Sequence, residues 1–144
     1  MVAMIWWTRH SDLTQERVWH VACPAVVSGL SLIGAAYLGN PVLAAVALTI
    51  CAMGVYATTA TFWTLPTGFL TGSAAAGGIA LINSIGNLGG FVGPYAIGWI
   101  KDATGEITLG LVVLAACSIM AGVVTFLMGH DSKMEMAGSR MMAD

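Results

Sequence analysis

The sequence predicts an all-α integral membrane protein with four transmembrane helices. Asp, Glu, Lys and Arg are all absent from Val18 to Ile100, which is more than half of the 144-residue chain. Apolar residues make up 58% of the chain and charged residues only 8%, against about 25% charged residues in an ordinary soluble domain. A soluble surface needs charged side chains, so the solvent that suits this composition is the lipid bilayer.

The spans follow from the turn residues that interrupt the apolar sequence. A helix needs about 20 apolar residues to cross the hydrocarbon core of a bilayer. The predicted transmembrane region, 18–128, therefore holds spans over residues 18–38, 41–62, 74–100 and 107–128. Gly39, Asn40 and Pro41 predict a tight turn, with the proline in the first turn of the next helix. Residues 67–73 and 101–106 are predicted connections, and 129–144 is predicted to be a disordered cytoplasmic tail.

The basic residues predict the orientation. Four spans place both ends of the chain on one side of the membrane, together with four of the five basic residues, namely Arg9, Arg17, Lys133 and Arg140. An excess of Lys and Arg marks the cytoplasmic side, so we expect a multi-pass cell-membrane protein with both termini in the cytoplasm. Every tryptophan lies near a predicted span end: Trp6, Trp7, Trp19, Trp63 and Trp99. This agrees with the predicted spans, because tryptophan is enriched at the level of the lipid headgroups.

The third predicted span carries the polar and flexible residues. Asn83 and Asn87 are four residues apart and project from one helix face, and Gly90 and Pro94 continue that stripe. Carboxamides at this depth are costly unless a partner satisfies them, so they either bond a neighbouring helix or line a polar cavity that binds a solute.

The glycines of the same span predict close helix packing. Two GxxxG pairs, Gly86 with Gly90 and Gly89 with Gly93, allow helix backbones to approach closely in lipid. We expect Gly89 and Gly90 to lie so close to a neighbouring helix that leucine at position 90 would disrupt folding. The internal Pro94 makes this helix easy to bend.

Other classes of function receive little support. Five scattered Lys and Arg residues do not form the basic patch that nucleic-acid binding needs. No nucleophile–base pair or carboxylate pair can be assembled from these residues, so we expect no enzyme activity, no cofactor and no metal site. The three cysteines have no redox or metal spacing and are expected to be small apolar packing residues: Cys23, Cys51 and Cys117.

A long motif in the second half of the chain resembles the sequence pattern of a known protein family. The segment from Phe62 to Gly105, and within it NSIGNLGGFVGPYAIGWIKDATG from Asn83, closely resembles the anion:cation symporter family of the major facilitator superfamily. WWTRHSDLTQER, from Trp6 to Arg17, resembles that family's cytoplasmic loop before the ninth span. The resemblance implies a partial C-terminal half of a twelve-span fold, covering spans nine to twelve, in a bacterial inner membrane. Residues 1–17 would then hold the end of a preceding span and a cytoplasmic loop.

The resemblance also implies a function and a site. It implies transport of a small organic anion, a sugar acid or dicarboxylate, by symport with a proton or cation. Trp63, Asn83 and Asn87 would contact the substrate from one wall of a central cavity. The family often has a hydroxyl residue one turn before the tryptophan, and this sequence departs from that pattern with Ala60.

The resemblance also implies that this chain works with a second six-helix half that it does not itself contain. The opposing N-terminal half, with the family's coupling acid and substrate-binding arginine, is expected to be supplied separately or replaced by self-association. Two alternatives stay open: an independent four-span protein acting as a homo-oligomer, and a non-functional remnant. No Asp, Glu, Lys or Arg lies within a predicted span to carry a coupling proton, and His20, at the cytoplasmic end of the first span, is expected to serve at the interface.

Overall fold

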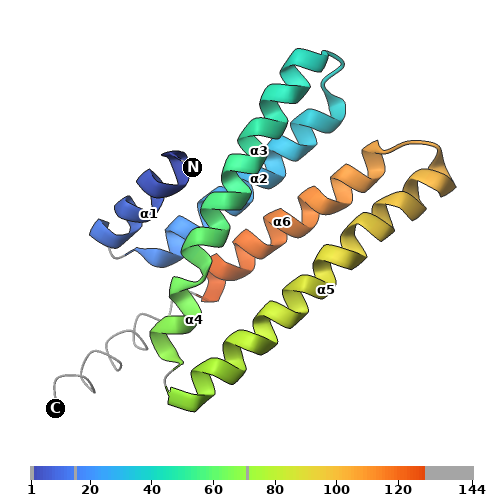
Figure 1. The fold of residues 1–144 in the computed structure, drawn as a ribbon. Coiled ribbons are helices and arrows are strands. Elements are labelled where there is room, and N and C mark those ends of the chain that lie inside the picture. The colour runs from blue at the N-terminus through green and yellow to red at the C-terminus, as the bar shows by residue number, and fades with distance from the viewer. Residues whose placement is uncertain (1, 15, 71, 129–144) are drawn as a thin grey trace.

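The computed structural model describes residues 2–14, 16–70 and 72–128, and this part of the chain is a bundle of helices (Figure 1). The helices are α1 (Val2–Thr14), α2 (Arg17–Tyr37), α3 (Pro41–Phe62), α4 (Thr64–Phe69), α5 (Gly72–Thr104) and α6 (Thr108–Met128). By length and composition, four helical segments could cross a membrane: Arg17–Tyr37, Pro41–Thr67, Ala75–Thr104 and Thr108–Met128. The predicted fold class, an all-α protein with four long apolar helices, is confirmed.

The helix ends follow the turn residues. α3 begins and ends at the predicted residues, and Asn40 caps its start: the side-chain oxygen of Asn40 accepts from the backbone N–H groups of Val42, at 2.9 Å, and Leu43, at 3.3 Å. α5 continues one turn beyond its predicted end and stops at Gly105, whose φ of +76° suits a residue without a Cβ.

Other segments that the sequence predicted as a connection or a loop are partly helical too, and the sequence interpretation is wrong there. Residues 67–73 contain the end of α4 and the start of α5, with Pro66 tolerated in the first turn of α4. Thr67 closes that turn by donating its hydroxyl to the Trp63 carbonyl at 2.8 Å. Residues 8–14 belong to α1 rather than to a loop, because polar residues sustain a helix when one face packs on a neighbour. The predicted tail, 129–144, lies outside the described residues.

Helix α2 is the centre of the bundle and lies between α3 and α6 (Figure 1). Small residues bring the backbones together. A Cβ added at Gly54 would lie 2.7 Å from the Pro24 carbonyl oxygen, and one added at Gly122 would lie 2.9 Å from the Ala22 carbonyl oxygen. The Ser118 hydroxyl on α6 donates to the Ala25 carbonyl on α2 at 2.8 Å. This close backbone packing is the means by which helices associate in lipid.

Helix α5 lies at the edge of the bundle, beyond α6 (Figure 1). It meets α6 near their connection, where a Cβ at Gly110 would lie 3.0 Å from Cγ2 of Ile97. Most of its remaining surface is exposed, including the large side chains of Leu88, Phe91 and Tyr95. The helix that the sequence marks as functional is therefore the one, among the four long helices, with the least contact to the rest of the described chain.

Candidate functional site

Trp63 lies at the junction of α3 and α4. It is half-buried, and its ring meets that of Phe62 edge to face, with centroids 5.5 Å apart. Trp63 is the residue at which α3 ends, and α4 begins at the next residue, Thr64. Thr61, which follows Ala60, is fully buried, and its hydroxyl donates to the His20 and Ala57 carbonyl oxygens.

Asn83 and Asn87 lie one turn apart on α5, and both are exposed. The structure records no hydrogen bond from either carboxamide to another described residue. Ser84, between them in sequence, donates its hydroxyl to the Ala80 carbonyl at 2.8 Å, so its polarity is satisfied within its own helix. The asparagines thus keep their donors and acceptors available, and the neighbouring serine does not.

The glycine stripe of α5 faces open space in this structure. A Cβ added at any of four glycines would meet no atom within 4 Å: Gly86, Gly89, Gly90 and Gly93. The close neighbour expected for Gly89 and Gly90 is not among the described residues, and Pro94 is exposed as well. A packing role for this stripe stays a prediction, and it needs a helix from elsewhere. Three glycines that pack closely against α2 or within it were not recognised in the sequence, because each belongs to a looser pattern of small residues four apart rather than to GxxxG: Gly29, Gly54 and Gly122.

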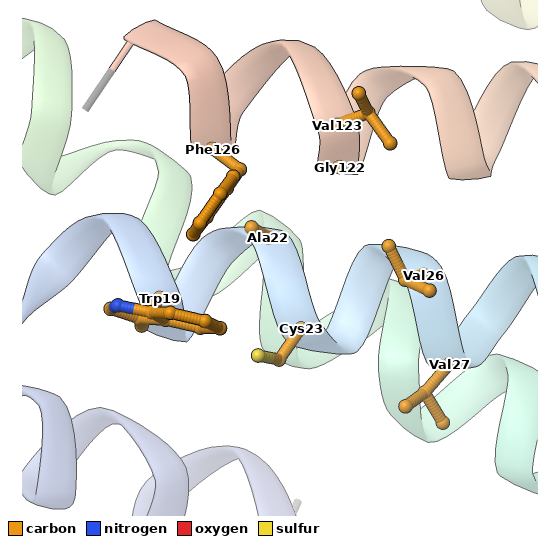
Figure 2. A pocket seen from close by; sticks show the side chains of 8 residues that line it. All are labelled: Trp19, Ala22, Cys23, Val26, Val27, Gly122, Val123 and Phe126. Atoms are coloured by element: carbon orange, nitrogen blue, oxygen red, sulfur yellow. The ribbon is translucent and has the colours of Figure 1, made fainter. Parts of the chain in front are cut away.

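Neither of two hollows on the described surface is lined by Trp63, Asn83 or Asn87. The larger, of about 370 Å³, is an apolar groove along α2 and α6 (Figure 2), lined by Trp19, Ala22, Cys23, Val26, Val27, Gly122, Val123 and Phe126. Phe126 reaches from α6 toward α2, and its ring meets that of Trp19 edge to face at 4.8 Å. The smaller, of about 260 Å³, is lined by Tyr95, Gly98, Trp99 and Asp102.

A second polar cluster joins α1, α2 and α3, and sequence analysis missed most of it. His20 is 6% exposed. Its ring bonds that of His10, with 2.8 Å between the nitrogens, and its carbonyl accepts from the Trp7 indole N–H at 2.9 Å and the Thr61 hydroxyl at 3.1 Å. The clue in the sequence is Pro24, four residues after His20: a proline there cannot donate to the His20 carbonyl, so another donor must.

The described residues contain no group of three or more His, Cys, Asp or Glu side chains placed to hold a metal ion. All three cysteines are free thiols: Cys23, Cys51 and Cys117. Cys51 faces the Ser28 hydroxyl at 3.4 Å, within the contact between α2 and α3. Cys51 therefore occupies a packing position, whereas Cys117 is exposed and does not.

Comparison with known proteins points to transport. The chain is 46% identical over 132 residues to an Agrobacterium vitis protein named "Putative tartrate transporter", an alignment that covers 92% of this chain and 29% of that protein. It is 40% identical over 119 residues to "Quinolone resistance transporter" of Acinetobacter baumannii, covering 83% of this chain and 27% of that protein. It is 36% identical over 118 residues to "Inner membrane transport protein RhmT" of Escherichia coli (strain K12), covering 82% and 27%.

No family model and no solved structure matches the chain. The chain spans less than a third of the length of the transporters that it resembles. The four helices that could cross a membrane are what a relative of membrane transporters should contain, so the structure and the sequence similarity agree. The chain is a multi-pass helical membrane protein related to bacterial transporters.

Proposed function

We propose that this chain is the C-terminal part, spans nine to twelve, of a major facilitator carrier from the anion:cation symporter family. The carrier takes up a small organic anion, a sugar acid or dicarboxylate, by symport with a proton or cation. The observation that carries this proposal is the 46% identity with a protein named for tartrate transport, over 92% of the chain. The relative named for quinolone resistance makes a different solute the main competing possibility.

The face of α5 that holds Asn83 and Asn87 suits this role. Exposed carboxamides in the middle of a membrane helix are costly in lipid, so a polar partner or a hydrated cavity is expected opposite them. Their amide groups donate and accept hydrogen bonds, which matches the carboxylate and hydroxyl groups of a sugar acid. Trp63 offers a ring face for the carbon skeleton and an indole N–H donor.

The glycine stripe supports the same arrangement. In this fold the substrate lies between two halves, and the halves move against each other around it. Helix α5 is the exposed edge of the described bundle, so its surface is available to the N-terminal half. Gly86, Gly90 and the other glycines would then let that half approach closely, and Pro94 would let the helix bend.

Orientation is the first part of the proposal to test. Both termini are expected in the cytoplasm, since four of the five basic residues fall on that side. Activity reporters fused after Asn40 and after Thr104 should report a periplasmic location, and one fused after Gly72 a cytoplasmic one. A cytoplasmic signal after Asn40 would contradict the assignment.

The substrate site is tested by substitution in a full-length carrier that contains this sequence as its last four spans. Asn83→Ala should raise the KM for organic-acid uptake about tenfold, since a hydrogen bond to a charged group contributes about 1.5 kcal/mol or more. Initial rates of radiolabelled tartrate and sugar-acid uptake measure the effect, with the amount of carrier in the membrane determined by immunoblot.

Ser84→Ala is the matched control, because that hydroxyl already bonds its own helix. It should leave the KM within about twofold of the original value, which corresponds to roughly 0.4 kcal/mol. Equal KM values for Asn83→Ala and the unchanged carrier would remove Asn83 from the site. Uptake of none of the organic acids by the unchanged carrier would contradict the proposed substrate class.

A further inference from the structure

The helical backbone that carries Trp63 is interrupted beside that residue. α3 ends at Trp63, and α4 begins at Thr64. Pro66 has no N–H group to donate to the Phe62 carbonyl, which would be its partner in a continuous helix. The hydrogen-bond ladder of α3 therefore does not run on through Trp63, and other contacts must fix the backbone there.

Threonine hydroxyls close this break from within. The Thr64 hydroxyl donates to the Thr61 carbonyl at 2.7 Å, and the Thr67 hydroxyl donates to the Trp63 carbonyl at 2.8 Å. Each of these bonds joins residues three or four apart in the chain, so it holds the shape of the turn. It does not hold the turn in its place within the bundle, which needs a contact with another helix.

Helix α2 supplies such contacts on both sides of Trp63. Before Trp63, the hydroxyl of Thr61 lies 3.1 Å from the His20 carbonyl oxygen. After Trp63, a guanidinium nitrogen of Arg17 donates to the Thr64 carbonyl at 3.4 Å. Arg17 and His20 belong to the first turn of α2, and α4 starts beside that turn (Figure 1). One turn of α2 therefore holds the two backbone positions that enclose Trp63.

The contact through Thr61 is the more shielded of the two. Thr61 is fully buried, and a hydrogen bond is stronger where water is excluded. The His20 carbonyl lacks a donor from its own helix, because Pro24 stands four residues further on. The same hydroxyl lies 2.9 Å from the Ala57 carbonyl oxygen, so it sits between the backbones of α2 and α3.

We propose that Thr61 and Arg17 are positioning residues that fix the ring of Trp63 through the first turn of α2. The inference rests on the proposed function where it concerns the substrate, because Trp63 is the residue that contacts the organic acid there. Without the Thr61 hydroxyl or the Arg17 guanidinium, the break loses its place against α2, and the Trp63 ring takes more than one orientation. Ordering that ring on binding costs free energy, which raises the KM.

Fluorine spectra of Trp63 test the positioning without any transport. The 144-residue chain is labelled with 5-fluorotryptophan and placed in lipid nanodiscs, and the Trp63 signal is identified by its loss in Trp63→Phe. Thr61→Val removes the hydroxyl but keeps the branched shape, so it should shift or split the Trp63 signal. Thr61→Ser, which retains the hydroxyl, should restore that signal. The signal of Trp99, on α5, is the internal reference and should stay in place throughout.

Thr59→Val is the matched control, because the exposed Thr59 hydroxyl bonds the Val55 carbonyl of its own helix at 2.9 Å. It should leave the Trp63 signal unchanged, and a shift equal to that of Thr61→Val would overturn the proposal. Arg17→Met keeps the apolar stem and removes the guanidinium. It should shift the Trp63 signal, so the proposal is tested even if Thr61→Val fails to fold. A Trp63 signal that stays unchanged in either folded variant would overturn the role of that residue.

Uptake by the full-length carrier tests the consequence for the substrate. Thr61→Val should raise the KM for organic acids about fivefold, the effect of about one neutral hydrogen bond, and Thr61→Ser should return it to within about twofold. The maximal rate should stay within about twofold, because a defect confined to binding leaves later steps unchanged. An unchanged KM in Thr61→Val would overturn the role in substrate binding. Uptake of none of the organic acids by the unchanged carrier would contradict the proposed function instead, and the Trp63 signal would then decide the positioning by itself.

Discussion

Leucine in place of Gly29 is expected to separate α2 from α6. A Cβ at this position would lie 2.6 Å from Cγ1 of Ile119 and 2.8 Å from the Ala115 carbonyl oxygen. The carbonyl belongs to a helix backbone and cannot rotate away as a side chain can. Overpacking a well-packed contact costs about 1–3 kcal/mol, and a whole leucine side chain against a backbone should cost about 3 kcal/mol or more. Thermal unfolding followed by circular dichroism in a mild detergent measures the loss.

Gly90→Leu is the matched control for that experiment. It makes the same change in an apolar helix, but at a position where a Cβ meets no atom within 4 Å. Because leucine has the higher helix propensity, Gly90→Leu should leave the free energy of unfolding of the 144-residue chain unchanged or raise it by up to about 1 kcal/mol. In a full-length carrier the same substitution should disrupt folding, since the opposing half is expected there. Equal destabilisation by both substitutions in the 144-residue chain would show that α5 is already packed against a second copy.

The 144-residue chain by itself is expected to transport nothing. Alternating access requires two halves that move around a central site. This chain spans 29% of the length of the tartrate-named relative, and its asparagines lie on an exposed face of α5 rather than in an enclosed cavity. Uptake of radiolabelled tartrate and sugar acids, in a bacterial host without its own organic-acid carriers, should equal that of cells with an empty vector.

The control for this result is the full-length carrier with the same last four spans, expressed in the same host. Its uptake should saturate with substrate concentration, and the amounts of the two proteins in the membrane should be compared by immunoblot. Saturable uptake by the 144-residue chain would instead support an independent four-span transporter, assembled from several copies with their α5 faces together.

The positions of the long helices could be predicted from the sequence because they depend on local properties. A long uncharged apolar run suits a bilayer, and Asn40 followed by Pro41 is a local signal for the start of a helix. Residues 67–73 were mispredicted as a connection, and much of the loop expected within residues 1–17 is helical, because polarity says nothing about whether a neighbouring helix stabilises a segment. The candidate residues Trp63, Asn83 and Asn87 came from polarity and a resemblance, and none of them lines the groove along α2 and α6 or the smaller hollow beside Trp99.

What the sequence by itself determined is therefore the solvent, the number of long helices and the places where they turn. Only the tertiary structure decided which small residues pack: Gly29, Gly54 and Gly122 do, while the more conspicuous stripe with Gly89 and Gly90 is open. It alone paired His10 with His20 across two helices. A side chain's neighbour depends on how the helices rotate and dock, and a pattern within one helix does not contain that information.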